Sequence, residues 1–401
     1  MKLLFLHSVA LYSGKANALQ VLHMCRAYSE LGIDVTLAVP ARKAVGQEEL
    51  RAAAEAQIGQ PIGFRIQPYR KFNFGGRFNE IGGLWGAQRL LQSQTADLCV
   101  TRSPAYVPLT IRRGIPTVFE AHNSILHDNP ILNRLRSAKL LRNCQREELV
   151  AFVAISSALA KFWSEAGVPK EKVIALHDGV DFEQFRNAPR RGAIRKKLGL
   201  HADRKIVVYT GSLYADRDID GILELAKAFP HTRFVVVGGP DEKARSFAAG
   251  AAGKGIANIE FTGRVPHARV KDYLFAADIL LMVWSRRVRT MNYCSPLKVF
   301  EYMAAGRTIV GHGFPTIREV LTHGKDALLC DPDSFDDLCG KLSQALAMPT
   351  ENAMADAARD LVRREYSWAT RAKRLISHVD ALTAPKPSRG VRRDAPPRPP
   401  T

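Results

Sequence analysis

Long apolar segments and paired cysteines are both missing from this chain of 401 residues. No apolar run approaches the roughly 18 residues that a membrane-spanning helix requires. The six cysteines are scattered and form no Cys-X-X-Cys pair, so the sequence indicates neither a disulfide framework nor a cysteine-bound metal site. The first apolar run ends at His7, and no small-residue cleavage site follows it. We therefore expect a cytoplasmic protein.

Several motifs that mark common enzyme classes are also missing. No Gly-X-X-X-X-Gly-Lys-Ser/Thr sequence occurs, which argues against a P-loop nucleotidase. No Gly-X-Gly-X-X-Gly follows the first apolar run, which argues against an enzyme that uses a nicotinamide cofactor. Neither Gly-X-Ser-X-Gly nor His-Glu-X-X-His is present, and no acidic metal-binding pair is recognisable. We therefore expect no metal site.

The chain is strongly basic. Its formal net charge is +19 and its pI is about 9.9, which favours anionic partners: nucleic acid, anionic lipid or phosphorylated small molecules. Part of this charge lies in residues 384–401, which include six prolines and five Lys/Arg and are expected to be disordered. The remainder is long enough for two domains of roughly 150–200 residues each.

Short apolar runs alternate with helical patterns, and the alternation restarts after about residue 185. Such runs predict parallel strands that are buried on both faces of a sheet. The first series of expected strands is Lys2–Leu6, Val35–Val39, Asp97–Thr101, Pro116–Phe119 and Ala151–Ile155. The second series is Lys205–Thr210, Phe234–Val237, Ile259–Thr262, Ile279–Val283, Thr308–Val310 and Ala327–Leu329. We therefore expect two doubly wound Rossmann-like α/β domains with a ligand site in the cleft between them.

The segment from Ser295 to Gly306 has the pattern of a short helix. Ser295 suits the N-cap, Pro296 the first helical position and Gly306 the position after the last turn. The N-terminus of such a helix attracts anions, and Glu301 can accept hydrogen bonds from vicinal hydroxyls such as those of a ribose. An ordinary capped surface helix with a solvated glutamate fits the same pattern.

The segment from Tyr209 to Gly221 indicates a strand, a tight turn at Gly211 and a helix that Arg217 precedes. Backbone N–H groups of the turn, the helix N-terminus and the arginine together suit a diphosphate. A plain strand-to-helix turn with a surface arginine is the alternative.

His122 follows Glu120 at the end of an expected strand. At that position a histidine can contact a sugar hydroxyl, or a charge that develops, in the cleft. A lone histidine more often has a structural role, so both interpretations remain open.

Two segments of the first half mix basic side chains with apolar ones. They are Pro68–Phe78 and Ile131–Arg142. Both are compatible with contact to an anionic membrane surface or to nucleic acid, and equally with a loop and a solvated amphipathic helix.

Taken together, these segments resemble the retaining GT-B glycosyltransferases of family four, over residues 1 to about 382. The most specific part of the resemblance is Ser295–Val310. The supporting segments are Ala154–Ser157, Asp178–Asp181, Val208–Gly211, Val235–Gly239, Phe261–Val265 and Tyr366–Trp368. The resemblance implies a first, acceptor-binding domain of residues 1–168 and 366–383, and a second, nucleotide-sugar-binding domain of residues 169–365. In this GT-B architecture the two domains face each other across a cleft, and the last helix crosses back onto the first domain.

The resemblance also implies roles for single residues. Glu301 would hold the ribose of the donor, and the backbone near Val265 would meet the base. The full set of implied donor-binding residues is Gly14, Gly211, Ser212, Val265, Pro296, Leu297 and Glu301. The residues implied to act in catalysis are His122, Arg217 and Lys298.

Two positions depart from the family pattern. Tyr293 stands where many members have an acid, which leaves the contact to the donor sugar unassigned. Ser212 stands where the phosphate loop usually has an arginine, so Arg217 must act with another cation, and we expect Lys298 to be that cation. The further options are Arg286, Arg287 and Arg289.

The resemblance implies a metal-independent, retaining hexosyltransferase that uses a UDP- or GDP-sugar and no cofactor. Its acceptor would be a glycan or a lipid-linked molecule of cell-envelope polysaccharide or glycolipid synthesis, reached at the inner face of the membrane, whose anionic surface is a further expected partner. A nucleotide-sugar epimerase on the same fold and a non-catalytic protein that binds nucleotide sugars or other anions are the alternatives. No specific nucleic acid is expected, because charge alone supports that partner.

Overall fold

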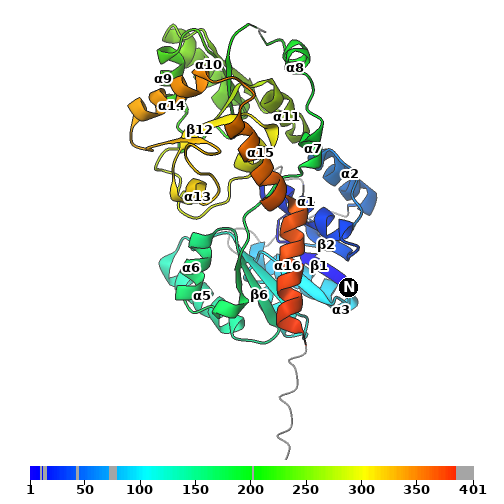
Figure 1. Cartoon of the computed structure of the whole chain (residues 1–401). Helices are drawn as coiled ribbons and strands as arrows, with labels where there is room; N and C mark the ends of the chain where they lie inside the picture. The colour runs from blue at the N-terminus through cyan, green and yellow to red at the C-terminus, as the bar shows by residue number, and fades with distance from the viewer. Residues whose placement is uncertain (10, 12–15, 42–44, 72–78, 201–202, 385–401) are drawn as a thin grey trace, which may run out of the picture.

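The computed structural model describes residues 1–384 except 10, 12–15, 42–44, 72–78 and 201–202. The segment 385–401, expected to be disordered, and the second half of the basic and aromatic segment 68–78 lie outside this range. The described residues form two α/β units, one above the other in Figure 1, each built around its own parallel sheet. This is the two-domain architecture that the sequence predicts.

The first sheet has the strand order β3-β2-β1-β4-β5-β6-β7, and all its neighbouring strands are parallel. Its strands are β1 (Lys2–Leu6), β2 (Asp34–Ala41), β3 (Arg65–Arg70), β4 (Leu98–Thr101), β5 (Thr117–Ala121), β6 (Leu149–Ala154) and β7 (Val173–Ala175). Its helices are α1 (Ala16–Glu30), α2 (Gln47–Ile58), α3 (Asn79–Ser93), α4 (Val107–Ile111), α5 (Pro130–Cys144) and α6 (Ser157–Glu165), with the 3-10 turn η3 (Lys170–Lys172) before β7.

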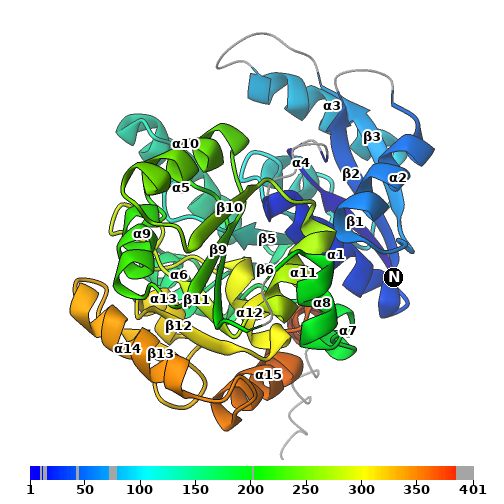
Figure 2. The same ribbon diagram turned by 90° about the horizontal axis from the view of Figure 1, so that it is seen from above.

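The second sheet has the order β10-β9-β8-β11-β12-β13 and is also parallel throughout. Its strands are β8 (Ile206–Thr210), β9 (Arg233–Val237), β10 (Ile259–Gly263), β11 (Ile279–Met282), β12 (Thr308–His312) and β13 (Leu328–Cys330). The helices that follow the first unit are α7 (Glu183–Arg186), α8 (Arg191–Lys197), α9 (Ile219–Ala228), α10 (Asp241–Gly253), α11 (His267–Ala276), α12 (Leu297–Ala305), α13 (Pro315–Arg318), α14 (Phe335–Ala347), α15 (Ala353–Glu365) and α16 (Trp368–Thr383). Figure 2 shows helices of this unit on both sides of its sheet.

The strands of the second sheet are buried on both faces, which explains their nearly continuous apolar sequences. In β8, Ile206 and Val208 face one core cluster, whereas Val207 and Tyr209 face another. A short apolar run with turn residues on both sides is readily recognised as a strand. The sequence therefore locates all six strands of this sheet to within two residues at each end.

Two edge strands of the first sheet, β3 and β7, were not predicted from the sequence. The strand β3 contains Pro68, which has no N–H group and is tolerated at a sheet edge. The strand β7 is short and pairs with β6, where Val173 is the partner of Phe152. The first sheet therefore continues past residue 168, and the predicted start of the second domain at residue 169 is too early.

The last helix, α16, returns to the first unit as the resemblance implies, and Figure 1 shows it beside α1. Trp368, Ala372 and Leu375 lie on one face of α16 and join a core cluster that includes residues of α1, β1 and β2. Arg371 is also buried, and its Nη1 donates to Glu120 Oε2 of β5 at 3.0 Å. Within the described part of the chain, no helix is both long enough and apolar enough to cross a lipid bilayer.

Candidate active site

Both sheets reverse their direction of winding at a central pair of strands. The pair is β1 and β4 in the first sheet, and β8 and β11 in the second. Loops that leave such a pair at the carboxyl ends of the strands diverge, and the crevice between them is the usual place for a ligand. In the second unit these loops lead into α9 and α12.

The loop after β8, which we call the phosphate loop (residues 211–218), lies against the loop after β9. Gly211 N donates to Val237 O, and Leu213 N donates to Gly239 O, both at 2.9 Å. A Cβ atom on Gly238 would lie 1.8 Å from the carbonyl oxygen of Gly211, and Gly238 has a φ of +142°. No other residue type fits there, so the close approach of the two loops depends on this glycine.

Arg217 and Ser212 are joined within the phosphate loop. Arg217 Nε donates to Ser212 Oγ at 3.1 Å, and the guanidinium lies 5.7 Å from the centre of the Trp284 ring. Ser212 therefore helps to hold Arg217 in place within the same loop. Arg217 remains 27% exposed, so a ligand can reach it.

Lys298 extends from the first turn of α12 toward the end of β8. Its Nζ donates to Thr210 O at 3.1 Å and lies 4.0 Å from the centre of the Tyr209 ring. Burial, and then the nearby charge of Arg217, lower the pKa of Lys298 well below its ordinary value, although Glu301 acts in the opposite direction. An anion bound beside Arg217 and Lys298 would reduce the repulsion between them.

The three further arginines occupy the loop after β11 and are exposed. Arg286 forms an ion pair with Asp333, and Arg289 Nη1 lies 3.6 Å from Asp128 Oδ1 of the first unit. The structure thus joins Ser212 and Arg217 within one loop, and it holds Lys298 Nζ at Thr210 O, the residue directly before that loop.

The start of α12 differs from the expected capping pattern. The helix begins at Leu297, and Pro296 occupies the N-cap position without a side-chain hydrogen bond. Ser295 Oγ instead accepts a hydrogen bond from Asp178 N, in the segment between the two units, at 2.8 Å. The prediction that Ser295 caps the helix is therefore wrong, whereas Gly306 ends it with a φ of +62° as predicted.

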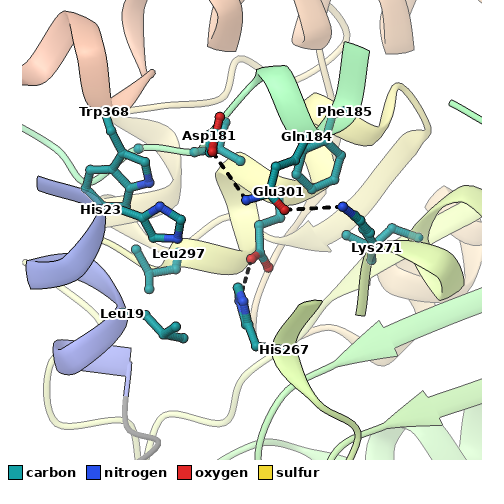
Figure 3. Close-up of a pocket in the computed structure, with 13 residues that line it drawn as sticks. Leu19, His23, Asp181, Gln184, Phe185, His267, Lys271, Leu297, Glu301 and Trp368 are labelled. Carbon is teal, nitrogen blue, oxygen red and sulfur yellow. Dashed lines mark hydrogen bonds and ion pairs between the residues drawn. The ribbon is translucent and has the colours of Figure 1, made fainter. Parts of the chain in front are cut away.

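A pocket lies between the two units beside Glu301 (Figure 3). Its walls come from α1, residues 179–185, α11, α12 and the start of α16. His267 Nε2 and Glu301 Oε1 are 2.9 Å apart across it. Burial lowers the pKa of His267, but the charge and the hydrogen bond of Glu301 outweigh burial, and the pKa lies above its ordinary value. The sequence analysis did not single out His267.

The other implied donor-binding residues frame this region. Val265 follows β10, is half-buried and packs against the core of the second unit. Leu297 lines the pocket and also packs against the core of the first unit, so it bridges the two. Pro296 is half-buried. Gly14 lies outside the described residues.

His122 lies in a buried charged cluster at the carboxyl end of β5. Its Nε2 is 2.6 Å from Glu120 Oε1. Burial raises the pKa of Glu120, but Arg371 and His122 outweigh it, so this pKa lies below its usual range. Burial and the charge of Arg102 lower the pKa of His122 to about 4. At neutral pH the pair is therefore a carboxylate and a neutral imidazole.

The candidate catalytic residues fall into two groups. Among the described residues, no hydrogen bond or ion pair joins His122 to Arg217 or Lys298. The contact of Arg371 with Glu120 was not predicted, because the two residues are 251 positions apart in the sequence and no local pattern relates them. Asp178, whose pKa burial raises to about 6, belongs to the same cluster.

Tyr293, where the sequence analysis noted the lack of an acid, joins the two units. Its carbonyl oxygen accepts from Ser156 Oγ at 2.7 Å, and its side chain packs against a core cluster of the first unit. Next to it, Glu319 accepts from Ser157 N at 2.8 Å and from Ala158 N at 3.1 Å, at the start of α6. The position therefore contributes to contact between the units.

Comparison with known proteins agrees with this architecture. The family model described as "Glycosyl transferases group 1" matches residues 204–348, and "Glycosyltransferase Family 4" matches residues 18–184. The lipopolysaccharide 1,2-N-acetylglucosaminetransferase of Salmonella typhimurium is 27% identical over 292 residues, which are 66% of this chain and 74% of that protein. The D-inositol 3-phosphate glycosyltransferase of Thermobispora bispora is 26% identical, over 53% of this chain and about half, 52%, of that protein.

A solved structure shows the same fold at low identity. The crystal structure of the Anabaena protein Alr3699/HepE in complex with UDP has a TM-score of 0.73 and 15% identity, and the superposition covers 95% of this chain and 100% of that one. The two family models lie on the two units described above, one on each. The chain therefore belongs to the group 1 glycosyltransferases and has the GT-B fold.

Proposed function

We propose that this protein transfers a hexose from a UDP- or GDP-sugar to an acceptor hydroxyl, in the synthesis of a cell-envelope polysaccharide or glycolipid. The observation that carries the donor class is the pairing of Arg217 and Lys298 beside two helix N-termini at the switch point of the second sheet. Such a site suits a diphosphate. Structures of the Anabaena protein in complex with UDP and with UDP-glucose support a UDP-sugar as the first donor to test.

The donor would lie along α12. Glu301 accepts hydrogen bonds from the ribose hydroxyls, and the backbone near Val265 contacts the base. The diphosphate lies at the other end of the site, against Arg217 and Lys298. The remaining contacts to the donor come from Gly14, Gly211, Ser212, Pro296 and Leu297.

Bond cleavage would place negative charge on the departing diphosphate. As the bond from the anomeric carbon to the phosphate oxygen breaks, the sugar develops oxocarbenium character. Arg217 and Lys298 stabilise the leaving group, and because both are already held by protein contacts, little reorganisation is needed. The diphosphate also supplies the opposite charge that keeps Lys298 protonated.

The resemblance to family four supports retention of configuration. The acceptor hydroxyl attacks the anomeric carbon from the face that the diphosphate leaves. Its oxygen forms the new glycosidic bond, and its proton passes to the departing phosphate oxygen. No protein base is required for this step.

His122 would orient the transferred sugar. Because Glu120 is ionised, His122 Nε2 carries the proton and donates to it, which leaves Nδ1 as an acceptor. His122 therefore accepts a hydrogen bond from a sugar hydroxyl in this proposal. The buried contact between Glu120 and Arg371 fixes the orientation of the carboxylate, and through it that of the imidazole.

The exposed face of α5 supports contact with an anionic membrane at the cytoplasmic face. Ile131 and Leu135 are 72% and 61% exposed, and α5 contains four basic residues and no acidic one. Exposed apolar side chains among cations suit the interface of an anionic bilayer. A lipid-linked acceptor would then be reached from that surface, in line with the lipopolysaccharide transferase named above.

Product analysis tests the proposed reaction. Purified protein is incubated with UDP- and GDP-hexoses and a panel of short glycans and lipid-linked sugars. We expect release of one nucleoside diphosphate and a new glycoside with the anomeric configuration of the donor, unchanged by EDTA because protein cations take the place of a metal ion. An inverted glycoside would contradict retention, loss of activity in EDTA would contradict metal independence, and an isomerised donor without transfer would indicate an epimerase.

A further inference from the structure

The pair of His267 and Glu301 is a contact of the pocket that the proposed function leaves unexplained. His267 lies in the first turn of α11, and Glu301 lies one turn into α12. Figure 3 shows the two side chains pointing toward each other from these helices, with the hydrogen bond between them. The side chains of His267 and Glu301 are 36% and 15% exposed, so both face the pocket and neither is sealed in the core.

The contact uses one oxygen of the carboxylate. His267 Nε2 lies 2.9 Å from Oε1, and within the described part of the chain no hydrogen bond is made to Oε2. An ionised carboxylate accepts hydrogen bonds through both oxygens. A ribose bound at Glu301 therefore meets a carboxylate whose rotation is already restricted by the histidine.

The surroundings of His267 oppose its charged form, and Glu301 is the group that stabilises it. A cation in the first turn of a helix is disfavoured by the helix dipole, and burial also opposes the charged form of His267. Glu301 compensates for both effects. Lys271, one turn further along α11, lowers the pKa of His267, and it donates instead to Gln184 Oε1 at 3.3 Å. His23 of α1 faces the pair from the first unit.

We propose that His267 is a positioning residue of the donor site, which holds Glu301 Oε1 so that Oε2 accepts a hydrogen bond from the 2′-hydroxyl of the ribose. The proposal rests on the proposed function, because it concerns the same nucleotide. According to this proposal, loss of His267 weakens donor binding only by weakening the contact between Glu301 and the ribose. The base and the diphosphate are bound by other groups and are not affected.

The test compares nucleotides with and without the 2′-hydroxyl. Affinities of UDP, GDP, 2′-deoxy-UDP and 2′-deoxy-GDP are measured by titration calorimetry on the whole chain. The variants are His267→Ala, His267→Gln, whose amide nitrogen can replace Nε2, and Lys271→Ala as a control on the same helix and pocket wall. Circular dichroism melting checks that each variant is folded.

We expect His267→Ala to weaken binding of the preferred ribonucleotide about tenfold, the effect of one hydrogen bond to a charged group. His267→Gln should stay within about threefold of wild type, as should Lys271→Ala. For the 2′-deoxynucleotide, the wild-type chain and His267→Ala should have nearly equal affinities. The missing hydroxyl and the missing histidine affect the same interaction, so their losses of binding free energy do not add.

Two results would overturn the inference. Equal losses with the ribonucleotide and its deoxy form would mean that His267 acts elsewhere in the pocket, and no loss at all would mean that the pair is merely structural. In both cases wild-type binding leaves the proposed function standing. If the wild-type chain binds none of the four nucleotides, the proposed function itself fails.

Discussion

At the phosphate loop, Arg217 and Lys298 are held by contacts of different kinds. Arg217 is partly exposed and contacts Ser212 and the Trp284 ring, whereas Lys298 is packed under the end of β8. Removing Arg217 therefore takes away charge with little loss of packing, and this makes it the more informative of the two positions.

Arg217→Ala should lower kcat by roughly 100-fold or more, the usual effect of deleting one preorganised group that stabilises developing charge. Steady-state kinetics with a saturating nucleotide sugar measures it, and the melting temperature should stay near that of wild type. Arg217→Lys, which keeps the charge but loses the guanidinium contact to Ser212, should recover part of the activity. Unchanged kcat in Arg217→Ala would remove this residue from the mechanism.

His7, directly after β1, predicts a pH dependence of stability. Neither of its ring nitrogens has a hydrogen-bond partner among the described residues, and burial, followed by the charge of Arg102, lowers its pKa to about 3. Because the folded pKa lies below the unfolded value of 6.5, stability is present above pH 6.5 and declines as the pH falls toward the folded pKa. The decline from this group is about 2 kcal/mol between pH 6.5 and pH 5.

His7→Leu should therefore lose less stability than wild type between pH 7 and pH 5. Urea unfolding at the two pH values measures the difference, with His231→Asn as a control because His231 is exposed. His122 and His23, whose pKa values are both lowered to about 4, leave a residual acid sensitivity in every variant. If His7→Leu and wild type lose equal stability, His7 does not titrate as described.

At the scale of single elements, α12 shows what a local pattern can and cannot predict. Its end at Gly306 follows from the sequence, because glycine adopts the left-handed conformation that ends a helix. The role of Ser295 does not follow, since its partner, the N–H of Asp178, is 117 residues away. A serine can cap a helix or accept a hydrogen bond from a distant residue, and the local sequence pattern cannot distinguish these two roles.

The helix α5 predicts binding to anionic vesicles. Flotation with phosphatidylcholine vesicles, with and without phosphatidylglycerol, should recover the wild-type chain only with the anionic lipid and less at higher salt. Lys139→Gln with Arg142→Gln should weaken binding about 30-fold, at about 1 kcal/mol for each exposed cation. Arg146→Gln is the control, because Arg146 already pairs with Glu148 at 2.9 Å.

Absence of wild-type binding to anionic vesicles at low salt would contradict a membrane role for α5. Equal binding of the charge variant and wild type would place the contact elsewhere. Replacement of Ile131 and Leu135 by serine separates the apolar contribution from the charge, since both side chains are exposed and their loss should not affect the core.

At the scale of the whole molecule, the architecture follows from the sequence better than the contacts between the units do. The second sheet is predicted strand by strand, because each strand is an isolated apolar run. In the first sheet β3 is hidden, since Pro68 and its basic neighbours look like a loop. The return of α16 to the first unit was predicted only from the resemblance to a family. The buried contact of Arg371 in α16 with Glu120 in β5 has no signal in the local sequence.

The candidate site divides in the same way. Ser212 and Arg217 share one loop, and Lys298 lies in the first turn of the helix after the neighbouring switch-point strand, so their neighbourhood follows from the order of the elements. His267 was missed, although it stands two residues after Val265 and 34 before Glu301, because nothing in the sequence shows that α11 and α12 face each other. Tyr293 was interpreted as a lost donor contact, and its contact with Ser156 depends on how the units pack.

The central claim is that the cleft beside α12 binds a nucleoside diphosphate, and a thermal-shift panel tests it most directly. The wild-type chain and Glu301→Ala are heated with UDP, GDP, ADP, CMP and short oligonucleotides at two salt concentrations. A ligand at about 100 times its Kd adds about 2.7 kcal/mol of stability. We predict selective stabilisation of wild type by one nucleoside diphosphate at both salt concentrations, and a smaller shift in Glu301→Ala. No shift with any mononucleotide, together with a salt-sensitive shift with oligonucleotides, would contradict the account.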